Sequence, residues 1–249
     1  MPPTPLPGQL FVTHDAAHVA EAAALRIARA LRRALRANGK ASLALSGGNT
    51  PRPAYEQLAA APDIDWSRVS VYWIDERAAA PTSDRSNYRL ARESLLSRAP
   101  IPDANVHRMK GDAADLDAAA REYEADLRAS LALGPGGAPS FDAAVLGIGD
   151  DGHTASLFPG EHLVEVTDRL VVSVPASPAR KTEARLTVTA PVIQSIGTLV
   201  VLAVGAAKHG PLERAWAREG TLVETPSRLF RTANGDVTWI VDKAAGGFA

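Results

Sequence analysis

Strand-like and helix-like segments alternate along almost the whole of this 249-residue chain. Short apolar runs typical of buried strands are separated by longer stretches in which apolar residues recur at helical spacing. Parallel strands need a crossover connection, usually a helix, to bring the chain back to the same end of the sheet. The alternation therefore predicts an α/β fold, with a mainly parallel sheet and helices on both of its faces.

The individual elements have expected positions. Strands are predicted at 41–45, 69–74, 105–109, 141–148, 170–174, 185–188, 199–204 and 237–241. The first helix is expected to be capped by Thr13 or Asp15 and to run to about 38, and further helices are expected from 51 and at 86–97, 114–131 and 206–218. Gly39 is expected to end the first helix, and residues 244–249 to form a weak, frayed tail. Neither a repeat nor a clear linker divides the sequence. We predict one domain over 1–249, with a core from about 10 to 241 and room for a small appended lobe.

Composition excludes several classes of protein. The absence of Cys rules out a disulfide scaffold, a thiolate zinc site and a cysteine nucleophile. The 27 basic residues against 28 acidic ones create no global field for nucleic acid or an anionic membrane. The longest apolar stretch, 199–207, is too short to cross a bilayer, and the N-terminus lacks the pattern of a signal peptide. A cytoplasmic protein without nucleic-acid or membrane partners is expected.

Ligands of parallel α/β sheets bind beyond the carboxyl ends of the strands, so the turns that follow strands are the places to search. Residues 46–51, Ser-Gly-Gly-Asn-Thr-Pro, follow a predicted buried strand and lead into a helix. Two glycines allow close backbone approach, and free N–H groups with the Ser46 and Thr50 hydroxyls would form an anion cradle. The alternative is a helix cap after a tight turn, which needs no ligand.

A second unusual turn covers residues 147–154 and matches the dinucleotide pattern G-x-G-x-x-G. Asp150 and Asp151 lie inside it and would repel a pyrophosphate, so we reject that reading. We expect a helix to start at His153 and its dipole to favour the neutral imidazole. A neutral imidazole beside carboxylates can act as a general base. The alternative is a histidine that only packs or caps at the turn.

Charged residues at other strand ends complete the candidate set. Asp75-Glu76-Arg77 is expected to form a turn after the strand at 69–74, where Asp75 could orient a catalytic group or hold a substrate hydroxyl. Arg77 could bind an anion, although a surface salt-bridge cluster would explain the same residues. Arg185 and Lys208 are further basic candidates. Lys208 is favoured because it follows the most apolar strand.

Six segments, taken in order, resemble the 6-phosphogluconolactonase family, within a superfamily that includes the glucosamine-6-phosphate isomerases and deaminases. They are residues 46–51, 73–77, 86–88, 147–160, 185–189 and 205–208, spread over about 10–241. The run Asp-Gly-His-Thr-Ala-Ser-Leu-Phe-Pro at 151–159 is the specific one. The resemblance implies a Rossmann-like fold and hydrolysis of 6-phospho-D-glucono-1,5-lactone to 6-phospho-D-gluconate in the oxidative pentose phosphate pathway.

The resemblance also implies roles for individual residues. His153 would be the general base, and Asp151 or Asp75 would orient it or a sugar hydroxyl. The phosphate would be held by Ser46, Gly47, Gly48, Asn49, Thr50 and Lys208, with Arg77 and Arg185 adding charge. Asn49 departs from the hydroxyl residue that is usual in the family. No metal and no organic cofactor is implied, and the implied partner is a small sugar-phosphate lactone. Independently of the resemblance, we expect a monomer.

Three other functions remain as alternatives. Deaminases of this superfamily carry a glutamate where this chain has Phe158, and that difference favours the lactonase. A non-catalytic sugar-phosphate sensor would keep the glycine-rich loop but would not need His153. A serine esterase that uses Ser46 would form a covalent acyl-enzyme.

Overall fold

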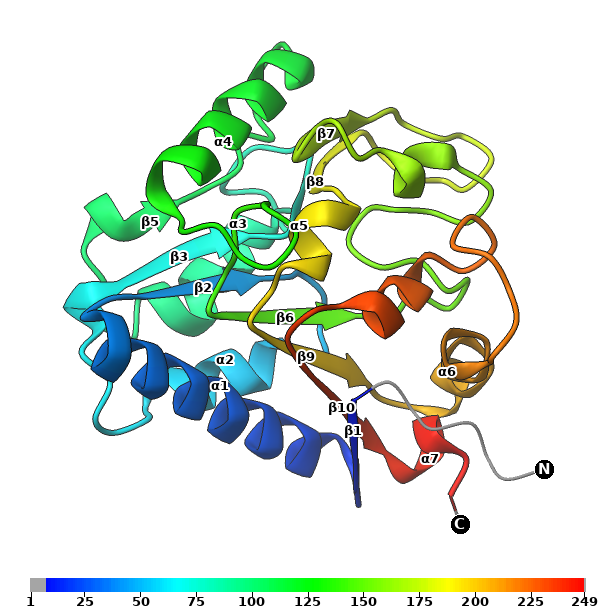
Figure 1. The fold of residues 1–249 in the computed structure, drawn as a ribbon, viewed down its shortest axis with the longest axis horizontal. Helices are drawn as coiled ribbons and strands as arrows, with labels where there is room; N and C mark the ends of the chain where they lie inside the picture. Colours follow the sequence, from blue (N-terminus) through cyan, green and yellow to red (C-terminus); the bar gives the residue numbers. More distant parts are fainter. Residues whose placement is uncertain (1–7, 249) are drawn as a thin grey trace.

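The computed structural model describes residues 8–248, and it centres on a seven-stranded sheet (Figure 1). The strand order is β1-β10-β9-β6-β2-β3-β5, and every neighbouring pair is parallel. The strands are β1 (Gln9–Thr13), β2 (Ala41–Leu45), β3 (Val69–Trp73), β5 (Val106–His107), β6 (Ala143–Gly147), β9 (Thr198–Ala203) and β10 (Asp236–Asp242). The predicted α/β class is therefore confirmed.

Helices lie on both sides of this sheet. They are α1 (Ala16–Asn38), α2 (Arg52–Ala59), α3 (Asn87–Ala91), α4 (Leu116–Ser130), α5 (Ala190–Gln194), α6 (His209–Trp216) and α7 (Lys243–Gly246). Figure 1 shows α1 and α2 below the sheet and α4 and α5 above it. Every residue of β2 and of β9 is buried, as expected for strands covered on both faces. None of the helices within residues 8–248 has the length and apolar character of a membrane span.

The long helix α1 follows the local rules that predicted it. Asp15 caps it by accepting a hydrogen bond from the backbone N–H of His18 at 3.0 Å. Gly39 ends it in the left-handed region, with φ of 72°, and donates its N–H to the carbonyl of Leu35. Its buried residues include Val19, Ala23, Ile27, Ala30 and Ala34, the apolar stripe expected at helical spacing.

A second, smaller sheet corrects one prediction. Asp75-Glu76-Arg77 is not a turn but a short strand, β4 (Asp75–Arg77). It pairs antiparallel with β8 (Arg185–Val188), which pairs antiparallel with β7 (Val171–Val174). The chain stays extended beyond Ile74 because backbone groups more than 100 residues away satisfy its hydrogen bonds, a partner that no local pattern reveals.

Both ends of the described chain are more ordered than predicted. Strand β1 was not predicted, and it forms the edge of the main sheet by pairing with β10. The tail expected to fray contains α7, which Asp242 caps by accepting a hydrogen bond from the N–H of Ala245 at 2.8 Å. Ala245 is fully buried, so packing holds this short helix. Ala249 lies outside the described residues.

Short helical turns complete the structure. The helix predicted at 86–97 is present as α3, continued by a π-helical turn at Arg92–Leu96. Turns of 3-10 helix lie at Trp66–Arg68, Asp103–Asn105, His162–Glu165, Ala206–Lys208 and Pro226–Thr232.

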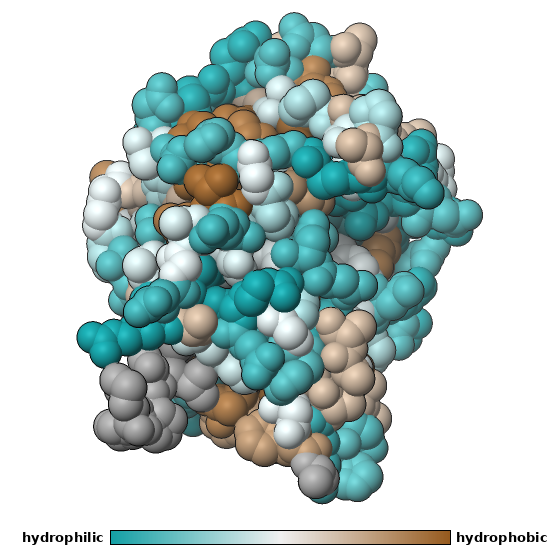
Figure 2. All heavy atoms as spheres, turned by 90° about the vertical axis from the view of Figure 1, so that its right-hand side faces the viewer, coloured by the Kyte–Doolittle hydropathy of each residue, from teal (hydrophilic) through white to brown (hydrophobic). Residues whose placement is uncertain are grey.

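Strands β2, β6 and β9 point to the right in Figure 1, and Figure 2 shows the molecule from that side. Hydrophilic residues dominate that surface, with small apolar patches among them.

Candidate active site

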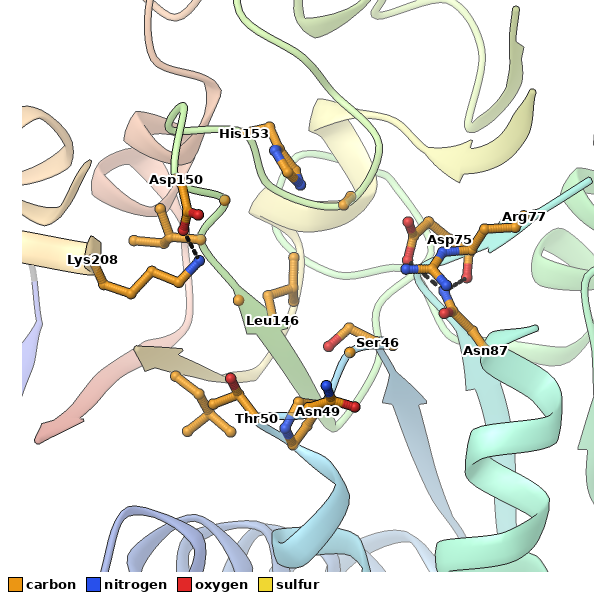
Figure 3. Close-up of a pocket in the computed structure, with 18 of the residues that line it drawn as sticks. Ser46, Asn49, Thr50, Asp75, Arg77, Asn87, Leu146, Asp150, His153 and Lys208 are labelled. Carbon is orange, nitrogen blue, oxygen red and sulfur yellow. Dashed lines mark hydrogen bonds and ion pairs between the residues drawn. The ribbon is translucent and has the colours of Figure 1, made fainter. Parts of the chain in front are cut away.

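A cavity of about 450 Å³ lies at the carboxyl ends of β2 and β6 (Figure 3). Its walls come from the turns after those strands, from β4 and β8, and from the segment before α6. The lining residues are Ser46, Gly47, Gly48, Asn49, Thr50, Pro51, Asp75, Arg77, Asn87, Leu146, Gly147, Ile148, Gly149, Asp150, His153, Ala155, Arg185, Leu202 and Lys208. All predicted site residues except Asp151 are in this wall, and Asp151 is paired with the imidazole of His153.

The glycine-rich loop at 46–51 is held in place by a buried tyrosine. The backbone N–H of Ser46 donates to the Tyr55 hydroxyl at 3.1 Å, and that hydroxyl donates to the carbonyl of Ser46 at 2.9 Å. Burial raises the pKa of Tyr55 above its ordinary value, so it stays a neutral donor. Gly48 has a φ of 96°, which favours glycine at this bend. The sequence patterns did not single out Tyr55.

Replacing Tyr55 by phenylalanine is expected to loosen this loop. The change leaves both backbone groups of Ser46 without these partners, at a cost of roughly 1–3 kcal/mol in the free energy of unfolding. The KM for a phosphorylated substrate should rise severalfold, measured by steady-state kinetics alongside urea unfolding. Tyr123→Phe is the matched control, since the Tyr123 hydroxyl bridges the N–H and carbonyl of Trp73 in the same way. Equal rises in KM in both variants would contradict a specific role for Tyr55.

His153 is oriented by Asp151. The imidazole Nδ1 lies 2.6 Å from Asp151 Oδ1, and the backbone N–H of His153 donates to the same oxygen at 3.0 Å. Burial alone would raise the pKa of Asp151, but the hydrogen bonds from His153 outweigh it and lower the pKa to about 2. An ionised carboxylate only accepts hydrogen bonds, so Nδ1 carries a proton, and in the neutral tautomer Nε2 is the acceptor.

No helix begins at His153, so that prediction is wrong. Residues 149–154 form a compact turn in which the Gly149 N–H donates to the carbonyl of His153 at 2.8 Å. Gly152 adopts a φ of 97°, and a bridge between Thr154 and Leu157 continues the irregular path. The ring of Phe158 lies 4.8 Å from the imidazole, centre to centre. The helix dipole that was expected to favour the neutral imidazole is therefore absent, and Asp151 and Phe158 are the side chains that contact the ring.

Asp75 has a different environment from Asp151. Its residue exposure is 5%, and its carboxylate accepts hydrogen bonds from Ser156 Oγ at 2.6 Å and Asn87 Nδ2 at 3.1 Å. Arg185 Nη1 lies 3.8 Å from the same carboxylate. Burial lowers the pKa of Arg185, and the charge of Asp75 opposes that effect. Of the two carboxylates that the sequence left open, Asp151 is the one bonded to the imidazole.

The three predicted cations do not gather at one point. Figure 3 shows Lys208 beside Asp150 on one side of the cavity and Arg77 beside Asp75 on the other. Lys208 Nζ is 2.5 Å from Asp150 Oδ1. Arg77 donates to the backbone carbonyl of Arg85 at 2.6 Å. Sequence reasoning treated Asp150 only as a repulsive charge and missed its pairing with Lys208, which the shared strand edge could have suggested.

Comparisons with known proteins agree on a family. Residues 14–239 match the model of a family described as glucosamine-6-phosphate isomerases/6-phosphogluconolactonase. A 6-phosphogluconolactonase from Synechocystis sp. is 38% identical over 226 residues, which cover 91% of this chain and 92% of that protein. These matches include nearly every element described above.

Solved structures show the same fold. The 6-phosphogluconolactonase from Trypanosoma cruzi superposes with a TM-score of 0.85 at 28% identity, covering 99% of this chain and 98% of that one. A monomeric glucosamine-6-phosphate deaminase superposes with a TM-score of 0.81 at 20% identity, covering 97% and 100%. The fold is thus common to both activities, and the side chains in the cavity must distinguish them.

Proposed function

This chain belongs to the family of glucosamine-6-phosphate isomerases and 6-phosphogluconolactonases, and we propose that it hydrolyses 6-phospho-D-glucono-1,5-lactone to 6-phospho-D-gluconate. That reaction is the second step of the oxidative pentose phosphate pathway. One observation carries the proposal: a histidine paired with a carboxylate shares a single cavity with a glycine-rich anion cradle. Such a cavity fits a substrate with a phosphate at one end and a reactive carbonyl at the other.

His153 supplies the base in this proposal. Its Nε2 takes a proton from a water molecule, whose oxygen attacks the lactone carbonyl carbon at C1. The C1–ring oxygen bond then breaks, and the imidazolium returns the proton to that oxygen. Asp151 keeps the ring in the required tautomer and stabilises its positive charge. Lactone carbonyls are reactive enough that the proposal needs neither a metal nor an organic cofactor.

The phosphate end is assigned to the loop at 46–50 and to Lys208. Backbone N–H groups of Gly47 and Gly48, the side chains of Ser46, Asn49 and Thr50 and the Lys208 ammonium would bind the phosphate oxygens. The phosphate would replace Asp150 as the partner of Lys208. Arg77 and Arg185 would add positive charge from the opposite side, and Asp75 would hold a sugar hydroxyl.

The cavity favours hydrolysis over deamination of an amino sugar. Phe158 stands where the deaminases, by resemblance, carry a glutamate, and it packs on the His153 ring. Proton shuttling between carbon atoms of an amino sugar would lack that carboxylate. Among the described residues, no hydrogen bond joins the Ser46 hydroxyl to the His153 imidazole, whose Nδ1 is paired with Asp151 instead. A serine nucleophile needs such a bond to its base, so its absence favours an activated water.

A substrate comparison tests the reaction class. The purified protein is given 6-phospho-D-glucono-1,5-lactone or glucosamine 6-phosphate separately, with a chelator present. Rapid acid release from the lactone and no ammonia from the amino sugar are expected. Ammonia release would establish the deaminase instead, and binding without turnover of either would establish the sensor. We expect the active form to be a cytoplasmic monomer.

Replacing Lys208 by methionine should act mainly on KM. A charge-assisted hydrogen bond to phosphate is lost, so KM is expected to rise about tenfold or more while kcat changes less. Asp150→Asn is the paired variant, because it removes the carboxylate that competes for Lys208. Its KM should stay the same or fall. An unchanged KM in Lys208→Met would remove Lys208 from the phosphate site.

A further inference from the structure

Asn87 lies in the cavity wall beside Asp75 (Figure 3). Its Nδ2 donates to the backbone carbonyl of Asp75 at 2.8 Å and to the Asp75 carboxylate at 3.1 Å. On the other side, its Oδ1 packs against Gly47: a β-carbon added to Gly47 would lie only 1.7 Å from this oxygen. One side chain thus contacts both the proposed phosphate loop and a carboxylate of the sugar end.

The backbone of Asn87 is fixed independently of these contacts. Its N–H donates to Glu76 Oε1 at 2.8 Å, and the same carboxylate also accepts from Tyr88 N–H at 2.7 Å and Ser86 Oγ at 3.0 Å. Burial raises the pKa of Glu76, while these donors favour its charged form. With Asn87 only 2% exposed, its side chain has little freedom to move away from either neighbour.

The amide orientation leaves one polar atom without a partner. Asn87 Oδ1 is buried and accepts no hydrogen bond within the described residues. Turning the amide would place this oxygen against the two oxygens of Asp75, which are acceptors themselves. The unpaired oxygen is therefore the consequence of using Nδ2 to hold Asp75. A buried polar atom without a partner calls for an explanation, and holding Asp75 supplies one here.

We propose that Asn87 is a positioning residue that sets the Asp75 carboxylate and the glycine-rich loop relative to each other. This inference rests on the proposed function, because that function places the lactone at Asp75 and the phosphate at Gly47. Binding of the phosphate then places the lactone ring correctly against the carboxylate. Loss of the Asn87 side chain separates the two ends of the site without removing a group that touches the reacting atoms.

The crowding at Gly47 supplies a direct test. The three atoms nearest to its added β-carbon all belong to the Asn87 amide, and Gly47 does not have a positive φ. Gly47→Ala should therefore clash most severely with the Asn87 amide and raise KM more than about tenfold. Asn87→Ala should lower kcat about tenfold, because the Asp75 carboxylate keeps Ser156 as a hydrogen-bond donor but loses Asn87, with a smaller effect on KM.

The double variant Gly47→Ala/Asn87→Ala distinguishes a specific steric contact between the two residues from a nonspecific loss of structure. It should recover most of the KM lost in Gly47→Ala, because the obstructing amide is gone, while kcat stays low. Gly48→Ala is the matched control. Gly48 has a positive φ of 96° and nothing within 4 Å of its added β-carbon, so Asn87→Ala should not rescue it. Additive effects of Gly47→Ala and Asn87→Ala on KM would overturn the proposal.

Two further measurements keep the test decisive. Calorimetric binding of 6-phosphogluconate to the same variants measures the coupling between residues 47 and 87 without relying on catalysis. If the wild-type protein shows no lactonase activity, the proposed function is refuted, but the coupling can still be tested by binding. If Gly47→Ala does not fold, recovery of folding in the double variant becomes the readout. Failure of the double variant to fold, while Asn87→Ala folds, would contradict Asn87 as the obstruction.

Discussion

Replacing His153 by glutamine is expected to lower kcat by about 10²–10⁴-fold. Glutamine can still donate a hydrogen bond to Asp151, which now accepts from the imidazole Nδ1 at 2.6 Å. Its amide cannot take a proton from water at neutral pH, so the base is lost while the turn keeps its shape. KM should change little because His153 is not assigned to the phosphate. Initial rates of acid release, corrected for spontaneous lactone hydrolysis, measure the effect.

A second histidine offers the control for this experiment. His162 also pairs with a carboxylate, its Nδ1 lying 2.6 Å from Glu165 Oε2, but the pair is exposed and outside the cavity. His162→Gln should therefore leave kcat and KM unchanged. Wild-type turnover in a correctly folded His153→Gln protein would remove the histidine from the mechanism, and the Asp151 pair would then be structural.

The substitution Gly149→Ala should displace the imidazole of His153 and lower kcat. A β-carbon at this position would lie 2.0 Å from His153 Nδ1 and 2.7 Å from Asp151 Oδ1. Gly149 does not have a positive φ, so alanine is compatible with the backbone and the conflict lies with these side chains. The imidazole must move from its position beside Asp151, and a misplacement of about 1 Å can cost about 10²-fold in rate. We expect kcat to fall by at least that factor.

Gly210→Ala is the comparison for this substitution. The nearest side-chain atom to its added β-carbon is 3.6 Å away, an ordinary contact, and helix α6 accepts alanine well. Its kinetics should match those of the wild type. A near-normal kcat in Gly149→Ala would show that catalysis tolerates a displaced imidazole. The close packing of Gly149 against His153 would then not be needed for catalysis.

Local patterns determined much of the fold. Apolar spacing and end signals located α1 before Gly39, with Thr13 or Asp15 as its expected cap, and an uninterrupted apolar run located β9. Both depend on residues close together in sequence, so they can be recognised without any knowledge of the rest of the chain. The same reasoning placed the candidate residues after β2 and β6, because parallel strands present their carboxyl ends at one edge.

Other features depend on contacts between distant residues. Asp75 becomes part of a strand only because Thr187 lies opposite it, and its carboxylate is held by Asn87 and Ser156. A helix was expected at His153, but glycine geometry and packing on Phe158 produced a turn. Such partners are separated by long intervals of sequence, and their pairing follows from the packed arrangement of both sheets.

The α/β architecture and the residue types available for chemistry could be predicted from local patterns, because strand, helix and turn preferences are local. Three contacts became visible only in the folded chain: Asp151 holds the imidazole, Tyr55 holds the loop at Ser46, and Asn87 contacts both Gly47 and Asp75. Hydrogen bonds and steric fit act over a few ångströms in space, whatever the distance along the chain.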